Sequence, residues 1–128
     1  MDPIADMLTS LINAQRAQKK RVAVPYSRFK EALLATLQEQ GFVSSVRTQD
    51  SPAAKLIVSL AYTEDGSPRL NGVKRLSTPG RRRYAGATQM PYNYTGFGKI
   101  IVSTSKGLME ADKAKKEKLG GELVCAIW

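Results

Sequence analysis

Residues 99–107, KIIVSTSKG, contain the strongest fold signal in the chain. Lys99–Thr104 is rich in β-branched residues, which favours a central strand. Ser103–Gly107 combines hydroxyls, a lysine and a glycine, which is typical of a tight exposed turn. The apolar segment Leu123–Trp128 predicts another strand, and the charged segment Glu110–Leu119, ended by two glycines, predicts a short helix between them.

Weaker signals precede this segment. Leu70–Leu76 is predicted as a strand, Ser77–Gly80 as a turn, and Arg81–Ala85 as a strand that returns along the first. Gly86–Gly98 is expected to be irregular because proline and glycine interrupt it. The C-terminal half is therefore expected to be mostly β with one short helix.

The N-terminal half predicts two helices. Asp2 before Pro3 is a typical N-cap with proline in the first turn. Apolar residues then recur at the spacing of one helical face through about residue 18: Ile4, Met7, Leu8, Leu11 and Ile12. Ser27 is the expected N-cap of the second helix, and Gly41 marks its end.

Three strands are predicted beside these helices. Val22–Val24 is a short apolar run stopped by Pro25, whereas Phe42–Thr48 and Lys55–Tyr62 are longer strands joined by the polar loop Gln49–Pro52. The predicted order in this half is therefore α-β-α-β-β.

Glu64-Asp65-Gly66-Ser67-Pro68 is the strongest break in the chain. The charge balance also changes there. We therefore expect an α+β protein made of two small α/β domains that share an interface, residues 1–65 and residues 66–128.

Composition excludes several classes of protein. The chain has 128 residues, one cysteine and no histidine. It offers no imidazole for catalysis, and Cys125 alone can form neither an internal disulfide nor a zinc site of several thiolates. The start does not resemble a secretion signal, and no run approaches the ~20 apolar residues that cross a bilayer. We expect a soluble, intracellular protein in which catalysis is disfavoured, with no metal, cofactor or membrane partner.

Positive charge is concentrated in the second half. The chain has 20 basic and 11 acidic residues and a net charge of +9. Residues 1–64 carry +2 and residues 65–128 carry +7. No acidic residue occurs between Gly66 and Met109, a stretch that contains Arg69, Lys74, Arg75, Arg81, Arg82, Arg83, Lys99 and Lys106. If these residues share a surface, they form a basic face suited to a polyanion; the alternative is an ordinary solvated surface.

The turn Ser103-Thr104-Ser105-Lys106-Gly107 is the first candidate site. Hydroxyls donate and accept hydrogen bonds, which suits 2′-hydroxyls, phosphate oxygens and base edges in the shallow minor groove of RNA. The alternative is an ordinary polar turn. The surrounding positive charge favours RNA.

Arg81-Arg82-Arg83-Tyr84 is the second candidate site. On the functional interpretation the arginines contact phosphates and Tyr84 stacks on a base or sugar; on the structural one Tyr84 packs at a core edge. For Tyr92 and Tyr94 the structural interpretation is favoured.

Lys74, Arg75 and Glu122 complete the candidate residues. Lys74 and Arg75 belong to the same basic stretch. Glu122 accepts from a base amino group or a 2′-hydroxyl if it faces the basic surface, and otherwise forms a surface ion pair.

Two other function classes remain open at this point. Ser103 and Lys106 match the S-x-x-K pattern of serine–lysine hydrolases, although the companion motifs are missing. The apolar helix face from Ile4 to Ile12 would serve a protein-interaction module if it were accessible to solvent.

Several segments resemble one known family. Ile101–Met109 (IVSTSKGLM), followed by Leu119–Cys125 (LGGELVC), closely resembles the C-terminal signature of the eighth protein of the bacterial small ribosomal subunit. Asp2–Thr9, Glu39–Phe42 and Ser77–Gly80 fit the same family, so the resemblance covers nearly the whole chain.

The resemblance implies a structural constituent of the ribosome, without catalytic activity, that binds the central domain of the small-subunit ribosomal RNA early in assembly. It also implies a cytoplasmic protein that is monomeric within the ribosome and contacts neighbouring small-subunit proteins. The family's RNA contacts carry over to Ser103, Thr104, Ser105, Tyr84 and Glu122, with Lys106 and Gly107 completing the loop.

The chain departs from this family at three places. Ser10 and Ile12 stand where the family commonly has arginines in its first helix, and Asn93 stands at a usually aliphatic position. Arg81–Arg83 is more basic than is usual. We therefore expect the first helix to contribute little to RNA binding and phosphate contact to shift toward Arg81–Arg83.

Overall fold

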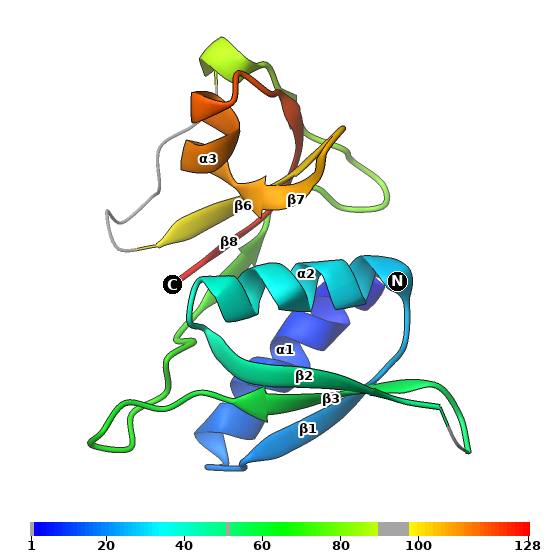
Figure 1. The fold of residues 1–128 in the computed structure, drawn as a ribbon, viewed down its shortest axis with the longest axis vertical. Coiled ribbons are helices and arrows are strands. Elements are labelled where there is room, and N and C mark those ends of the chain that lie inside the picture. The colour runs from blue at the N-terminus through cyan, green and yellow to red at the C-terminus, as the bar shows by residue number, and fades with distance from the viewer. Residues whose placement is uncertain (1, 51, 90–97) are drawn as a thin grey trace. The chain divides into compact units, whose positions relative to one another are not determined.

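The computed structural model describes residues 2–50, 52–89 and 98–128 (Figure 1). Its elements in chain order are α1 (Pro3–Arg16), β1 (Arg21–Pro25), α2 (Arg28–Glu39), β2 (Val43–Gln49), β3 (Lys55–Leu60), β4 (Val73–Arg75), β5 (Tyr84–Ala85), the 3₁₀ turn η1 (Ala87–Gln89), β6 (Lys99–Thr104), β7 (Gly107–Glu110), α3 (Ala111–Lys116) and β8 (Gly121–Ile127). The described residues thus form a mixed α+β protein with two antiparallel sheets, as predicted. Tyr92, Asn93 and Tyr94 lie outside the described residues.

The chain divides into two compact units. The first is Pro3–Asn71, and the second is Gly72–Trp128 together with Asp2. The turn at Glu64–Pro68 folds back on the first unit. Tyr62 and Pro68 form an isolated β-bridge, and the Arg69 amide donates to the carbonyl of Ala61 at 3.0 Å. These bonds explain why the first unit extends past the break at Glu64–Pro68.

The N-terminal unit contains a three-stranded sheet in the order β1-β3-β2 (Figure 1). Residues alternate along β3, where Leu56, Val58 and Leu60 are buried and the residues between them are half-buried. Helices α1 and α2 cover the buried face with apolar side chains, among them Leu8, Leu11, Leu33, Leu34 and Leu37. One face of this sheet therefore belongs to the core, and the other faces away from both helices.

The helix starts predicted from local sequence signals are correct for both helices. Helix α1 begins at Pro3, and the side chain of Ser27 accepts a hydrogen bond from the Lys30 amide at 3.1 Å to cap α2. Helix α1 ends at Arg16, before the predicted end, because Gln18 has a φ of 57° and turns the chain out of the helix.

The apolar face of α1 is buried. Met7 and Leu8 are 2% and 1% exposed, and Leu11 is not exposed at all. The alternative of a protein-interaction module, which required this face to be accessible to solvent, is therefore wrong, because these side chains are the core of the first unit.

The C-terminal unit contains the second sheet, in which β8 is the central strand. Strands β4 and β5 pair with successive parts of β8, and β6 pairs with its other side and with β7. Helix α3 packs on β6 and β7 over a core formed by Leu76, Ile100, Val102, Met109, Ala111, Ala114, Leu123 and Ala126.

Two predictions for this unit are wrong in detail. Arg81–Ala85 does not return along Leu70–Leu76 as a hairpin. Only Val73–Arg75 and Tyr84–Ala85 are strands in these segments, and both pair with β8. Helix α3 is shorter than Glu110–Leu119, because Lys118 has a φ of 57° and the Leu119 amide donates back to the carbonyl of Ala114.

None of the helices in the described residues has the length and apolar character needed to span a membrane.

Candidate nucleic-acid interface

The candidate turn is the tip of the β6–β7 hairpin. Thr104 pairs with Gly107, which leaves Ser105 and Lys106 as an exposed two-residue loop. Gly107 has a φ of 108°, a conformation that side-chain-bearing residues rarely adopt, so glycine is required for this tight turn.

The Thr104 hydroxyl fixes the shape of this tip. It donates to the carbonyl of Gly107 at 2.8 Å and accepts from the Lys106 amide at 3.1 Å. Because its proton is used inside the turn, Thr104 holds the loop in place, while Ser105 and Lys106 are exposed to solvent.

Three predicted site residues lie in one row across the sheet. In the antiparallel register, Glu122 of β8 is opposite Tyr84 of β5 on one side and Ser103 of β6 on the other. Directly opposite residues project from the same face of a sheet, with their Cβ atoms about 4.5–5.5 Å apart. A phenol ring, a carboxylate and a hydroxyl are thus brought together from three separate segments.

This row lies on the sheet face opposite α3. Val102 and Leu123, the neighbours of Ser103 and Glu122 in sequence, belong to the core under α3, and side chains alternate between faces along a strand. Tyr84 is 71% exposed. The row is therefore accessible, with Tyr84 as its most exposed member.

Gly121 permits the close approach of β8 and β6 beside this row. A Cβ at Gly121 would lie 2.1 Å from the carbonyl oxygen of Ser103 and 3.2 Å from Cα of Thr104. Because both obstacles are main-chain atoms, only glycine allows this spacing. The same closeness sets the position of Ser103 relative to Glu122.

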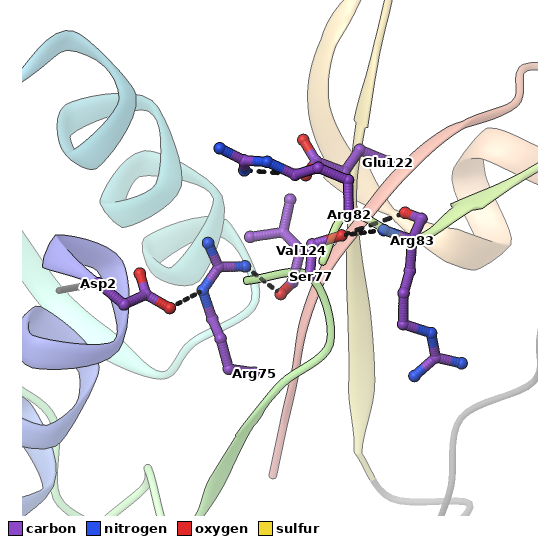
Figure 2. Close-up of polar contacts among 7 residues, drawn as sticks. All are labelled: Asp2, Arg75, Ser77, Arg82, Arg83, Glu122 and Val124. Carbon is purple, nitrogen blue, oxygen red and sulfur yellow. Dashed lines mark hydrogen bonds and ion pairs between the residues drawn. The ribbon is translucent and has the colours of Figure 1, made fainter. Parts of the chain in front are cut away.

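Arg82 faces the Glu122 carboxylate. Its Nη1 lies 3.1 Å from Oε2 of Glu122, and the two side chains are 49% and 20% exposed (Figure 2). The pair combines a cation for phosphate with an acceptor for an amino or hydroxyl group.

Ser77 is a positioning residue that the sequence analysis missed. It is fully buried; its Oγ accepts from the Arg83 amide at 2.8 Å and donates to the Arg83 carbonyl at 3.2 Å (Figure 2). These bonds hold the backbone between Arg82 and Tyr84. The only sequence signal was a serine at the start of a predicted turn, which is too common to identify its role.

The basic residues of 66–109 do not form one continuous face. Lys74 and Arg75 are neighbours on β4 and project from opposite faces. Arg75 is largely buried, with Nε 3.0 Å from a carboxylate oxygen of Asp2 and Nη1 donating to the Val124 carbonyl at 2.6 Å. Arg75 therefore supports the second unit internally and does not present its charge to a ligand.

Other cations are also divided or paired. Figure 2 shows the side chain of Arg83 directed away from Glu122 and Arg82. Lys99 Nζ lies 3.2 Å from Oε2 of Glu110. Arg81 is exposed, and its backbone forms an isolated β-bridge with Thr78 across the turn.

Cys125 has no exposed surface and lies on the central strand. Burial away from water raises the pKa of its thiol to about 12, so the thiol is neutral and unreactive at physiological pH. Within the part of the chain that the structure describes, no three Cys, Asp or Glu residues gather as a possible metal site.

The described residues define a small α+β protein with an exposed row of polar side chains on its C-terminal sheet. The model of the family Ribosomal protein S8 matches residues 2–128. The small ribosomal subunit protein uS8 of Desulfovibrio desulfuricans is 47% identical over 127 residues, which cover 99% of this chain and 98% of that protein. The uS8 proteins of Nitratidesulfovibrio vulgaris (45%; 99% and 98% covered) and Anaeromyxobacter sp. (42%; 99% and 97% covered) are similar over the same extent.

The chain belongs to the ribosomal protein S8 family. This family is structural and non-enzymatic, so the hydrolase considered for Ser103 and Lys106 is not the function of this chain. The motif S-x-x-K is here part of a β-hairpin, where Ser103 belongs to the strand and Lys106 to the turn.

Proposed function

We propose that this protein is a primary RNA-binding protein of the small ribosomal subunit, which binds the central domain of the small-subunit ribosomal RNA during assembly. The named relatives are bacterial small-subunit proteins, which supports a place in the cytoplasmic ribosome beside ribosomal RNA and other ribosomal proteins. Within the subunit the protein acts as a monomer.

The observation that carries this proposal is the row Tyr84–Glu122–Ser103 beside the hairpin tip. The wide, shallow minor groove of RNA presents 2′-hydroxyls and base edges to side chains that can both donate and accept. Ser103 and Ser105 supply hydroxyls, Glu122 accepts from an amino group or a 2′-hydroxyl, and Tyr84 offers an exposed ring for stacking.

Cations near this row supply affinity of a different kind. Arg81, Arg82 and Lys106 are exposed, and each phosphate that they neutralise releases counterions. Arg83 is also exposed, but its side chain is directed away from Glu122 (Figure 2), so we assign it to phosphates outside the contact made by the row. Lys74 is exposed but projects from the other face of the sheet, and Arg75 is committed to Asp2, so we assign neither to the contact with the minor groove.

The test removes the hydroxyls of the row and of the hairpin loop in one double variant, Ser103→Ala with Ser105→Ala. A matched control, Ser10→Ala with Ser44→Ala, removes two hydroxyls from the other unit. Affinities for a central-domain transcript and for an unrelated duplex are measured by filter binding over a range of KCl concentrations. The preference for the central domain should fall by about 1–3 kcal/mol, as for lost base contacts, with little change in salt dependence.

An unchanged ratio between the two RNAs would show that the hairpin does not discriminate. A footprint of the unmodified protein on deproteinised small-subunit ribosomal RNA tests the proposal directly. Protection confined to the central domain supports it, and protection elsewhere refutes it.

A further inference from the structure

The N-terminal sheet has a second face that no helix covers. The residues of β1, β3 and β2 that alternate with the buried ones project from this outer face. They form three cross-strand rows: Arg21–Ser59–Ser45, Ala23–Ile57–Arg47 and Pro25–Lys55–Gln49. Arg21, Ala23, Pro25, Ser45 and Arg47 are exposed, and the remaining four are half-buried.

The outer face has three cations and no acidic residue. Arg21, Arg47 and Lys55 come from three different strands and three different rows. With strands about 4.8 Å apart and alternate residues about 6.7 Å apart, their Cα atoms form a triangle with sides of roughly 8–14 Å. Flexible side chains of this spacing can reach several phosphates of one polynucleotide.

These cations differ from those of the C-terminal sheet in their partners. Arg75, Arg82 and Lys99 are each within ion-pair distance of a carboxylate. Among the described residues, no such pair involves Arg21, Arg47 or Lys55. The N-terminal half has the smaller net charge, yet its sheet presents cations that no carboxylate neutralises.

We propose that the outer face of the N-terminal sheet is a second RNA-binding surface, which holds the phosphodiester backbone of an RNA helix. This inference rests on the proposed function, because it assigns a second contact to the same RNA-binding protein. Charge complementarity selects the occupant: three unpaired cations with Ser45 and Ser59 as hydroxyl donors match a row of phosphates.

The chemistry of this face also determines what it reads. It has no aromatic side chain for stacking and no carboxylate to accept from a base. Ala23, Pro25 and Ile57 make its surface low between the longer cations, so a backbone can approach closely. The face therefore contributes affinity and orientation without sequence preference, while discrimination stays with the C-terminal hairpin.

The main test removes the three charges from the full-length protein: Arg21→Gln, Arg47→Gln and Lys55→Gln together. The control Arg28→Gln, Lys113→Gln and Lys116→Gln removes three exposed cations from the helices and has the same net charge. The probe is a transcript of the small-subunit ribosomal RNA central domain, measured by filter binding between 50 and about 300 mM KCl.

The sheet variant should lower the slope of log K against log [KCl] by up to about 0.7–0.9 for each lost phosphate contact, hence by about 2 for three. The control should change the slope by less than half as much. Replacing Arg21 and Arg47 by Lys, with Lys55 kept, should restore the slope because a point charge suffices for phosphate. Circular dichroism checks that both triple variants are folded.

A second experiment locates the RNA on this face. Because Cys125 is buried and its thiol is neutral, an A23C variant can carry an iron–EDTA probe in the middle row of the outer face, on the edge strand β1, and an S105C variant can carry one at the hairpin tip. Hydroxyl radicals from the A23C site should cleave the transcript at a discrete set of nucleotides that differs from the set cut from S105C.

The outcomes separate this inference from the proposed function. If the sheet variant matches the control in slope, or if the A23C probe produces no discrete cuts while the S105C probe does, the outer face does not bind RNA and the hairpin assignment stands. If the sheet variant binds the transcript normally but fails to join a subunit assembled with the other ribosomal proteins, the face binds a protein partner and the inference is overturned. If the unmodified protein shows no preference for the central domain, the proposed function itself fails.

Discussion

Replacing Gly121 with alanine should separate the two central strands of the C-terminal sheet. The added Cβ would lie 2.1 Å from the carbonyl oxygen of Ser103, whereas close C···O contacts in sheets are about 3.3 Å or longer. The strands must therefore part by about 1 Å, which stretches the hydrogen bonds near Ser103 beyond their normal range. Overpacking of about 1–3 kcal/mol and a weakened buried hydrogen bond of about 1–3 kcal/mol predict a total loss of roughly 2–6 kcal/mol.

Urea denaturation followed by circular dichroism measures this loss. The midpoint should fall by roughly 1–3 M, given the usual urea dependence of small proteins. Gly80→Ala is the matched control, because a Cβ at Gly80 meets no atom within 4 Å, and its stability should stay within about 0.5 kcal/mol of the original. If Gly121→Ala is as stable as Gly80→Ala, the close approach of β8 and β6 is not a constraint on this sheet.

Three other predictions follow from the same unit. Glu122→Gln should change the free energy of unfolding by less than about 1 kcal/mol, because its partner Arg82 is 49% exposed. Filter binding should nevertheless show that this variant binds unrelated RNA more tightly and prefers the central domain less. Unchanged binding to both RNAs would contradict the role of Glu122. Ser77→Ala leaves the part-buried Arg83 amide without its acceptor and should cost about 1–3 kcal/mol in urea denaturation, with faster amide exchange at Arg83 and Tyr84; normal exchange there would show that Ser77 does not position this segment. The Cys125 thiol has a pKa of about 12 in the folded protein and about 8.5 when unfolded, so its contribution to stability is fully present below pH 8.5 and is lost as the pH rises toward 12; iodoacetamide at pH 8 should react with Cys125 in urea and hardly at all in buffer, and equal rates would contradict its burial.

Local signals predicted the elements whose causes are local. The apolar spacing from Ile4 onward and the cap at Ser27 gave both N-terminal helices, and alternation gave β3. Helix ends were less predictable, because Gln18 and Lys118 turn the chain in a conformation that glycine usually adopts. That choice depends on surrounding contacts rather than on the intrinsic preference of either residue.

Strand pairing was beyond local signals. Nothing in Arg81–Ala85 shows that Tyr84 pairs with β8, which lies much later in the chain, rather than with the nearby β4. Long-range pairing depends on which faces can be buried together, and sequence patterns report the face of a strand but not its partner.

The sequence by itself determined the α+β class, the family resemblance and the hydroxyl-bearing turn, because helix caps, side-chain alternation and turn residues act over a few neighbouring positions. Only the tertiary structure decided which charges are available. It pairs Arg75 with Asp2 and Arg82 with Glu122, and it exposes Arg21 and Arg47 on an outer sheet face in the half with the smaller net charge. The physical reason is that the field at a surface depends on distances between charges and on their burial, and both are set by strand register rather than by position along the chain.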